Sequence, residues 1–433
     1  PFDDPAGFKF GESGSENVIK CGLYIGNENA DGPEIFLGWE PQWVLLKHSS
    51  GGSDWKLFDS MRGVVTGGAD AGTQPNKSDA DFTNSDRIDF NPTGFKIPTS
   101  SGAYNGNDAS YIFCAIRRPD GYCGKLAEAG TDVFAMDTGS GSSTIPNFDS
   151  GFPVDFTFMK KPASSSNWFT YARLTQKFEL VLNSTAAQGG ASDYTFDSNV
   201  GWGKGGDSSD WQSFMFKRHA GFDVVTYKGN AVEGRHIPHS LSKTPEMVWV
   251  KSRSDVDDWF VYHKGLNGGT NPEQYHLHLN TDSSQSQSIN AWNNQAPTST
   301  HFIIDDNDGV NKSGSNFIAM LFASTDVSHV GYYSGNNSGQ TITTGFQPRF
   351  IIIRTTGSNS WFVFDTVRGW TQALTLVPYL RLDTNNAQSD HPNDDPADVG
   401  YPTSTGFYLT GESGNGYIGT NKTGYSYIYY AHA

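Results

Sequence analysis

Two pairs of oppositely charged residues stand at equivalent places in the chain, Asp59 with Arg62 and Asp365 with Arg368. Each pair comes just after an apolar run, where a carboxylate and a guanidinium can bridge a turn and fix its shape. The same two groups could instead bind a ligand. A third equivalent stretch reads Tyr-His-Lys-Gly at 262–265, so the fold does not generally require the pair. We therefore favour turn fixing over a ligand site.

Histidines are concentrated in one part of the chain and could bind a metal. His276 and His278 would share one face of a strand, and a third histidine from a neighbouring loop could complete a transition-metal site. No Cys-x-x-Cys or His-Glu-x-x-His pattern accompanies them, so we favour exposed strand histidines and predict no metal site. The histidines concerned are His236, His239, His263, His276, His278 and His301.

Two acidic stretches invite a calcium interpretation. The first, 305–309, would need an acid at Ile304 to complete the alternating ligand pattern, and no bidentate glutamate follows it at the expected offset. The second is Asn393 to Asp398. We favour solvated turns at both places, with calcium as the alternative, and predict no required cofactor.

Paired carboxylates could also hydrolyse sugars, but they would need to lie about 5 to 10 Å apart. The acids of this chain fall mostly in turns rich in Gly, Asn and Ser. The sequence has no Gly-x-Ser-x-Gly elbow, Walker loop or dinucleotide fingerprint. We therefore predict that the protein is not an enzyme.

Charge and hydropathy restrict the partners. The formal net charge is -16, with 30 Lys and Arg against 46 Asp and Glu, which argues against binding to nucleic-acid backbones. No apolar stretch approaches the roughly 18 residues that span a bilayer, so no membrane insertion is expected. The chain opens on Pro1 without a methionine, which suggests that it begins inside a longer product or after processing.

The three cysteines, Cys21, Cys114 and Cys123, are an odd number without metal-ligand spacing. They therefore predict neither a disulfide framework nor a zinc site. Cys21 and Cys114 fall in expected strands, where we favour small buried side chains.

These residues must be positioned by a scaffold that repeats. Four times the chain shows a proline, a β-branched strand ending in a basic residue, a short polar gap and a tryptophan. The spacing suits a β-sandwich of roughly 100 residues and is too long for a propeller blade. The prolines are Pro41, Pro153, Pro245 and Pro348, and the tryptophans are Trp55, Trp168, Trp259 and Trp361. Residues that recur in every copy are expected to be scaffold.

Composition agrees with a turn-rich β protein, since the chain has 49 Gly, 20 Pro and 14% aromatic residues. We predict an all-β fold, a tandem array of four small antiparallel β-sandwich-like modules. Their expected bounds are 1–122 (repeat 1, with an N-terminal lead-in), 123–219 (repeat 2, the most divergent), 220–325 (repeat 3) and 326–433 (repeat 4).

Short apolar runs bounded by turns mark the expected strands. In repeat 1 they are 18–25, 43–47, 55–58, 94–97 and 111–116. The opening strand recurs at 132–136, 224–227 and 330–333, and the closing strand recurs at 211–216, 317–322 and 427–431.

The junctions between repeats are short, for example at 117–121 and 324–326. They predict modules held end to end in a stiff, elongated array. Burial of the recurring tryptophan is expected to anchor each module separately and to contribute about 2 to 3 kcal/mol per large side chain.

Aromatic residues outside the repeated pattern are the better candidates for binding. Those in Gly-, Asn- and Pro-rich segments could stack on sugar rings or pack at subunit interfaces. The alternative is that they cover the ends of their own sandwich. The candidates are Trp202, Trp292, Trp370, Tyr379 and Tyr401.

Several segments resemble a repeat of bacteriophage virion proteins, especially tail-fibre-like proteins of marine phages. They are Gly-Trp-Glu-Pro-Gln-Trp-Val-Leu-Leu-Lys at 38–47, Phe-Asp-Ser-Met-Arg-Gly at 58–63, Phe-Asp-Thr-Val-Arg-Gly at 364–369, Tyr-Ile-Phe-Cys-Ala-Ile-Arg-Arg-Pro at 111–119, Leu-Phe-Ala-Ser at 321–324 and Tyr-Ile-Tyr-Tyr-Ala-His-Ala at 427–433. The resemblance covers nearly the whole chain. It implies a structural or adhesive virion component and brings no catalytic residues with it.

We therefore expect a tail fibre or fibre-like protein of the virion that contacts host-surface glycans or other virion proteins. Resemblance to fibres implies a homo-oligomer, with a trimer favoured. A capsid-decorating protein is one alternative. A secreted protein that binds or hydrolyses carbohydrate is another.

Overall fold

The structure is a computed structural model that describes residues 18–118, 124–190, 192–372, 377–389, 400–411 and 419–433. Within these ranges nearly all regular structure is antiparallel β-sheet, which confirms the predicted all-β fold. Helix is limited to single short turns. They are α1 (Gly102–Asn105), α2 (Asp308–Asn311) and three 3-10 turns at Gly130–Asp132, Leu266–Gly269 and Pro272–Gln274.

Repeat 1 contains a five-stranded sheet and a three-stranded sheet. In spatial order the larger sheet is β1 (Ile19–Ile25), β8 (Ser110–Arg117), β3 (Pro41–His48), β4 (Lys56–Asp59) and β5 (Gly72–Thr73), and the smaller is β2 (Glu34–Phe36), β7 (Gly94–Lys96) and β6 (Asp89–Asn91). The opening strand thus pairs with the closing strand, which pairs in turn with the strand that follows the recurring proline.

The same strand order recurs in the larger sheets of the other repeats. In repeat 2 it is β9 (Phe134–Thr138), β15 (Gln212–Phe216), β11 (Phe156–Lys160), β12 (Phe169–Ala172) and β13 (Leu180–Val181). In repeat 3 it is β16 (Phe222–Lys228), β23 (Asn316–Phe322), β18 (Met247–Ser252), β19 (Phe260–His263), β20 (Tyr275–His278) and β21 (Ser286–Gln287). In repeat 4 it is β24 (Ser328–Ser334), β31 (Ser426–His432), β26 (Phe350–Thr355), β27 (Phe362–Asp365) and β28 (Leu380–Arg381).

Each of these sheets is covered on one face by a small sheet of its own repeat. The small sheets are β10 (Phe148–Asp149) with β14 (Gly201–Trp202), β17 (Arg235–Pro238) with β22 (His301–Ile304), and β25 (Gln340–Thr343) with β30 (Gly406–Leu409) and β29 (Tyr401–Thr403). Side chains alternate between the two faces of a strand, so every second residue enters the core of its own repeat. In β18 these are Val248 and Val250, and in β26 they are Ile351 and Ile353.

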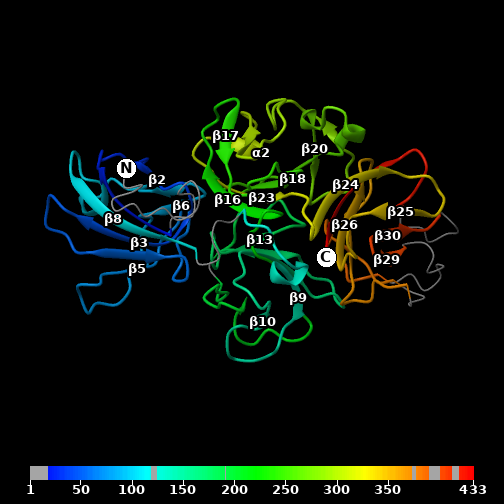
Figure 1. Ribbon diagram of the computed structural model, residues 1–433, viewed down its shortest axis with the longest axis horizontal. Coiled ribbons are helices and arrows are strands. Elements are labelled where there is room, and N and C mark those ends of the chain that lie inside the picture. Colours follow the sequence, from blue (N-terminus) through cyan, green and yellow to red (C-terminus); the bar gives the residue numbers. More distant parts are fainter. Residues whose placement is uncertain (1–17, 119–123, 191, 373–376, 390–399, 412–418) are drawn as a thin grey trace.

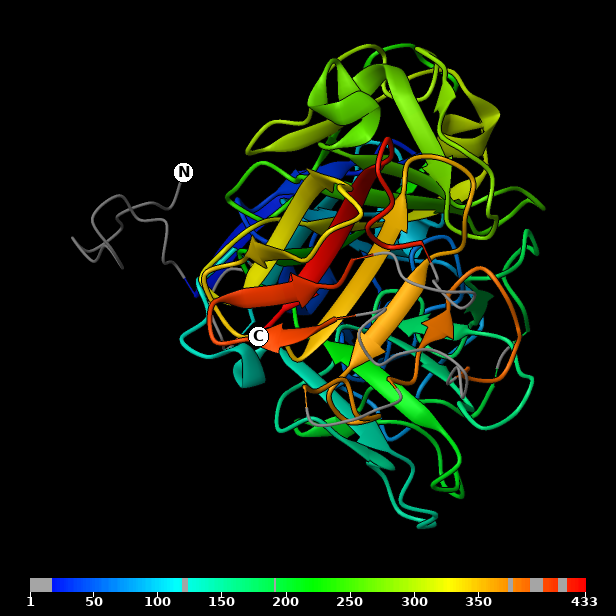
Figure 2. The same cartoon turned by 90° about the vertical axis from the view of Figure 1, so that its right-hand side faces the viewer.

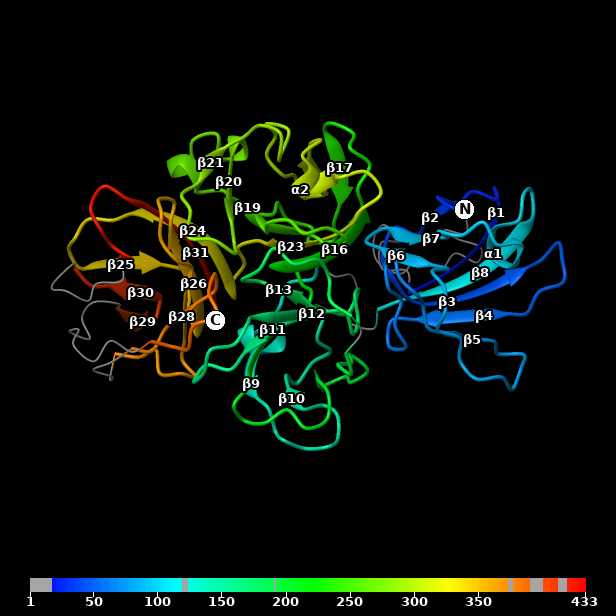
Figure 3. The ribbon, with the colours of Figure 1, turned by 180° about the vertical axis from the view of Figure 1, so that it is seen from behind.

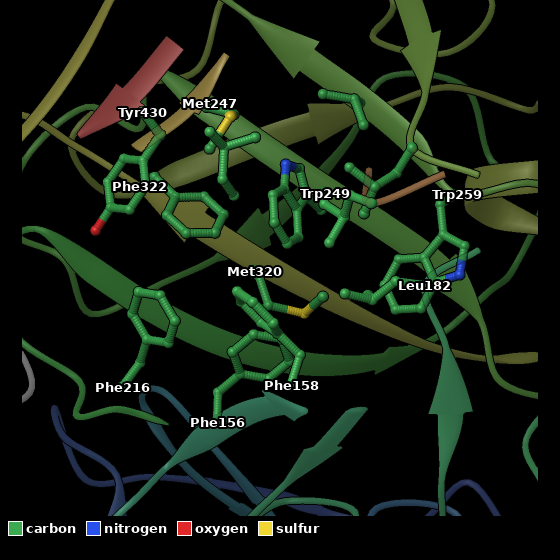
Figure 4. Packing of buried hydrophobic residues seen from close by; sticks show 14 of the residues in the cluster. Phe156, Phe158, Leu182, Phe216, Met247, Trp249, Trp259, Met320, Phe322 and Tyr430 are labelled. Carbon is green, nitrogen blue, oxygen red and sulfur yellow. The ribbon is translucent and has the colours of Figure 1, made fainter. Parts of the chain in front are cut away.

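The other face of the larger sheet is also buried in repeats 2, 3 and 4, because the three sheets pack against one another (Figure 4). Phe158, Trp249 and Ile352 occupy equivalent positions in these repeats and lie in one shared core. Aromatic rings join every pair of repeats within it: Phe156 with Phe222 at 5.7 Å, Phe214 with Phe350 at 5.4 Å, and Phe322 with Tyr430 at 4.8 Å between ring centroids.

Repeats 2, 3 and 4 therefore cluster around a common centre, and repeat 1 stands to one side of them (Figures 1 and 3). Viewed from the end opposite repeat 1, the strands of repeat 4 face the reader (Figure 2). The predicted end-to-end arrangement is wrong for repeats 2 to 4, because their sheets use the outer face as a joint core instead of exposing it to water.

Candidate functional site

The recurring tryptophans of repeats 2, 3 and 4 lie where these repeats meet. Each of their indole N–H groups donates to a backbone carbonyl of a different repeat. Trp168 donates to Arg381 at 2.8 Å, Trp259 donates to Val181 at 2.9 Å, and Trp361 donates to His278 at 3.0 Å. Repeat 2 thus contacts repeat 4, repeat 4 contacts repeat 3, and repeat 3 contacts repeat 2. The contacts form a closed three-membered ring.

The basic residue that ends the repeated strand makes a second set of ring contacts. The Lys160 ammonium donates to the Asn385 carbonyl at 3.1 Å, and the Lys251 ammonium donates to the Thr185 carbonyl at 3.2 Å. The guanidinium of Arg354 donates to the carbonyls of His278 and Thr281. These donors join the same pairs of repeats as the tryptophans.

A backbone contact completes the ring. The N–H of Gln188 donates to Arg253, that of Gln285 to Thr356, and that of Gln388 to Pro162, at 2.9, 2.9 and 2.7 Å. The predicted separate anchoring of each module by its tryptophan is therefore wrong, since these indoles tie neighbouring repeats together. Trp168, Trp259 and Trp361 are at most 1% exposed, whereas Trp55 of repeat 1 is only partly buried.

A buried network of charges joins repeat 1 to the ring. The Arg218 guanidinium lies 2.6 Å from Glu40 of repeat 1 and 2.5 Å from Asp223 of repeat 3. Asp155 of repeat 2 accepts two hydrogen bonds from Arg118, at 2.7 and 3.0 Å. All five side chains are at most 10% exposed. Three repeats thus meet at one charged junction.

Burial alone would raise the pKa of the Asp155 carboxyl, but the positive charges around it outweigh burial. Arg118, followed by Arg173 and Arg218, holds the pKa of Asp155 well below its ordinary value. Glu40 and Asp155 line a small hollow that has room for about one water molecule. Within the part of the chain that the structure describes, this arrangement suits a structural joint between repeats.

A second group of acids lies where repeat 1 faces repeat 3. Burial raises the pKa of Asp70 to about 7, although the backbone N–H groups of Arg87, Ile88 and Val65 donate to its carboxylate. Burial, then the nearby Asp89 and Asp70, raises the pKa of Asp86 as well. Lys228 and Arg253 of repeat 3 act in the opposite direction on Asp86.

Four of the five aromatic residues predicted to bind are buried in the core of their own repeat. Trp202 is 0% exposed, Trp292 and Trp370 are 2% exposed, and Tyr379 is 1% exposed. Their rings are packed by neighbours, as where Trp202 stacks on Phe148 at 5.6 Å and donates to the Ser213 hydroxyl. The interpretation as exposed stacking faces is wrong for these four, and the alternative that they cover their own sandwich fits their burial.

Tyr401 differs from the other four because its side chain is half-buried. It stacks on Tyr408 of the neighbouring strand, with 5.1 Å between ring centroids. Tyr401 is the one predicted aromatic residue that still presents surface to solvent.

The charged pairs Asp59 with Arg62 and Asp365 with Arg368 fix turns, as predicted. In each pair the aspartate accepts from the backbone N–H of the arginine, at 2.8 and 2.9 Å, while the guanidinium contacts the same carboxylate. Asp365 also accepts a hydrogen bond from Gln212 of repeat 2.

His236, in β17, is an exposed strand residue as we favoured, but most histidines of repeat 3 are not. His239, His263 and His276 are at most 8% exposed, and burial lowers their pKa values. His236 and His301 stack on each other at 4.1 Å on the small sheet. Among the described residues no group of three or more His, Cys, Asp or Glu could hold a metal ion.

The first acidic stretch forms a turn in which Asn307 caps the short helix α2 by accepting from Gly309. The second, Asn393 to Asp398, lies outside the described residues. Cys21 is exposed and Cys114 is half-buried, so the expectation that both are buried is wrong. Cys123 also lies outside the described residues.

Comparison with known protein families identifies the family of the chain. Residues 15–118 and 206–433 match a family described as a domain of unknown function, DUF7483. The chain belongs to the DUF7483 family. The DUF7483 match covers the recurring tryptophans of repeats 1, 3 and 4 but omits most of repeat 2, the most divergent copy. None of the curated proteins compared with the chain matches it.

No helix within the described ranges of this DUF7483 chain is long and apolar enough to cross a membrane.

Proposed function

We propose that the chain is a structural or adhesive component of a bacteriophage virion, a tail fibre or fibre-like protein that contacts host-surface glycans or other virion proteins. The observation that carries this proposal is the use of the recurring residues. The tryptophan and the basic residue of repeats 2 to 4 join one repeat to the next. The repeated pattern thus builds an assembly of rigid sandwiches, which suits a protein that holds and presents surfaces.

The proposal assigns no catalytic role. The buried polar network around Arg218 and Asp155 consists of ion pairs between repeats. For glycan contact, Tyr401, beside Tyr408, is the one of the five predicted aromatic residues that suits stacking. A charged cofactor or a nucleic acid has no place in this proposal, in keeping with the net charge of -16.

Copy number in purified particles tests the proposed location. A fibre is present in few copies per particle, whereas a capsid-decorating protein is present in hundreds. Quantitative mass spectrometry of the chain against the major capsid protein separates these two cases. Absence of the chain from purified particles would contradict both and favour the secreted alternative.

The adhesive part of the proposal needs a second experiment. A glycan array probed with the purified chain should show binding to a subset of glycans, and Tyr401→Ala should weaken that binding. A reducing-sugar assay on the bound glycans should show no release. Sugar release by the chain would contradict the proposal and support the carbohydrate-hydrolysing alternative.

A further inference from the structure

The larger sheet of repeat 1 leaves an apolar face uncovered. Its outward side chains come from β1, β8, β3 and β4, and the central ones are only partly buried. Leu23 is 66% exposed, Ile19 is 59% exposed and Ile25 is 49% exposed. We call this surface the repeat 1 face; it comprises Ile19, Cys21, Leu23, Ile25, Trp43, Leu45, Trp55, Leu57, Ile112, Cys114 and Ile116. A contiguous apolar surface of this kind marks an interaction site.

The central part of the same face is buried in the other three repeats. A recurring hydrogen bond aligns them, because the backbone N–H of each recurring tryptophan donates to an Asn or Asp side chain. The pairs are Trp55 with Asn76, Trp168 with Asn183, Trp259 with Asn280 and Trp361 with Asp383, at 3.0, 2.8, 2.9 and 3.0 Å. Repeat 1 therefore has the local geometry of the ring repeats without having ring neighbours.

The strand pairing also matches residue by residue between repeat 1 and the ring repeats. Leu45 opposes Cys114 in repeat 1, as Trp249 opposes Met320 in repeat 3 and Phe158 opposes Phe214 in repeat 2. These counterparts in repeats 2 and 3 are 0% exposed because other repeats cover them. Leu45 occupies the same position but remains partly exposed.

The repeat 1 face is more apolar than its counterparts along β1. Leu23 and Ile25 stand where repeat 3 has Thr226 and Lys228. At the opposite edge Thr73 replaces the leucine found in β13, β20 and β28. The apolar area is thus displaced toward β1, and it faces open solvent there.

We propose that the repeat 1 face binds the same face of two further copies of this chain, so that three chains form a homotrimer around a three-fold axis. The ring inside one chain is the template for this trimer, because the corresponding faces of repeats 2, 3 and 4 already pack against one another there. Three copies of a single face close the same ring with exact symmetry, as cyclic oligomers do.

The template specifies contacts between copies. In each ring repeat, the carbonyl that accepts from a neighbour's indole belongs to the residue opposite the one that follows the recurring tryptophan; these acceptors are Arg381, Val181 and His278. In repeat 1, Lys56 follows Trp55, and the pairing of Leu57 with Thr73 places Gln74 opposite Lys56. Gln74 is therefore the corresponding acceptor. The Trp55 indole should therefore donate to the Gln74 carbonyl of the next copy. No hydrogen bond from this indole is found among the described residues of the single chain.

Charge also favours a further copy of this chain as the binding partner of the repeat 1 face. Lys47 corresponds to Lys160, Lys251 and Arg354, and within one chain its ammonium donates to the carbonyls of His48 and Ser53. In the ring the equivalent cations also reach carbonyls of the next repeat. The partner for Lys47 is then the loop that follows β5 in the next copy, which carries Asp79 and Asp81.

Light scattering coupled to size exclusion tests the proposal on the full chain. The wild-type protein should have three times the chain mass of 47.3 kDa. Leu57 corresponds to Val261 and Val363 of the shared core, so Leu57→Glu places three like charges in the interface and should yield monomer. Val256→Glu, at a residue 74% exposed and outside the face, should remain trimeric. A monomeric or dimeric wild type, or a trimeric Leu57→Glu variant, would overturn the proposal.

The two cysteines of the face give a readout that does not depend on mass. In a Cys123→Ser background, Cys21 and Cys114 should react slowly with a thiol reagent in the trimer. The Leu57→Glu variant should react at least about tenfold faster, because separation exposes both thiols. Equal rates in the two proteins would contradict the proposal.

Another candidate to cover the face is residues 1–17 of the same chain. If that segment covers it, the wild type is a monomer with protected thiols, and deleting 1–17 exposes them; this result overturns the trimer. If deletion leaves a trimer with protected thiols, the proposal stands. Neither result bears on the proposed virion role, which copy number and glycan binding test separately.

Discussion

The indole N–H of Trp259 in repeat 3 donates a 2.9 Å hydrogen bond to the carbonyl oxygen of Val181 in repeat 2. Trp168 and Trp361 make the corresponding contact to repeats 4 and 3. The recurring tryptophan, which the sequence predicts to lie in the core of a single repeat, therefore joins two repeats. We therefore expect the stability of each of these three repeats to depend on the other two.

Replacing a ring tryptophan by phenylalanine should destabilise the ring. Trp168→Phe, Trp259→Phe and Trp361→Phe each remove one inter-repeat hydrogen bond and leave a small cavity, so each should lower the free energy of unfolding by about 1 to 3 kcal/mol. Trp211→Phe, at a partly exposed residue outside the shared core, should have little effect. Chemical denaturation of the four variants measures the difference, and a cost for Trp211→Phe as large as for the ring residues would contradict the prediction.

The Asp155 network should make the protein sensitive to acid. Because the folded-state pKa of Asp155 is depressed, its contribution to stability is present above its ordinary pKa of 3.8 and is lost as the pH falls below that value. Asp155→Asn should cost about 3 to 5 kcal/mol near neutral pH, since it leaves buried guanidinium groups without their counter-charge. Unfolding free energy measured against pH should show the two proteins converging in acid.

A surface aspartate provides the control for that experiment. Asp210 is 69% exposed and lies 3.9 Å from Lys161. Asp210→Asn should change stability little and should not alter the pH dependence. A pH profile for Asp155→Asn that runs parallel to the wild type would show that this carboxylate is not the acid-sensitive group.

The acids between repeats 1 and 3 should make the folded state less stable as the pH rises, which is opposite to the effect of Asp155. The folded-state pKa values of Asp70 and Asp86 are raised above the ordinary value of 3.8, in the first case to about 7. The folded state therefore loses stability as pH rises from about 4 to about 8. Asp86→Asn should gain melting temperature relative to wild type over this range, whereas Asp31→Asn, at an exposed residue, should not. A difference that stays constant with pH would count against this assignment.

The link between Arg218 and Glu40 should hold repeat 1 against the ring. Arg218→Met leaves both Glu40 and Asp223 without this cation, and breaking a buried pair costs about 3 to 5 kcal/mol. Glu40→Gln removes only the charge of one partner and should cost less. Amide hydrogen exchange at 60–67 should accelerate in both variants, because Thr66 contacts repeat 3 through Thr226 and Arg253. Unchanged exchange at 60–67 would contradict the linking role.

Strand positions could be predicted because alternation and turn residues are local properties of the chain. The runs at 111–116, 317–322 and 427–431 all fall inside closing strands, β8, β23 and β31. β23 and β31 are buried on both faces because other repeats cover their second face. β8 is not covered in this way, and its Ile112 is 40% exposed.

The arrangement of repeats could not be predicted for a related reason. Leu45, Phe158, Trp249 and Ile352 are equivalent apolar residues, yet three are covered by sister repeats and Leu45 is not. The type of residue at this position does not determine whether another repeat packs against it. The buried Trp202 and Trp292 were misplaced similarly, because glycine-rich loops can fold back over an aromatic ring as well as expose it.

The shared core of repeats 2, 3 and 4 is tested most directly by hydrogen exchange in a Trp249→Ala variant. Trp249 is 0% exposed and lies in that core, and its truncation should cost about 3 to 5 kcal/mol. Phe317→Ala, in the separate core of repeat 3, serves as the matched control. We predict faster exchange in β11 and β26 as well as in β18 for Trp249→Ala; acceleration confined to repeat 3 would contradict a core shared by three repeats.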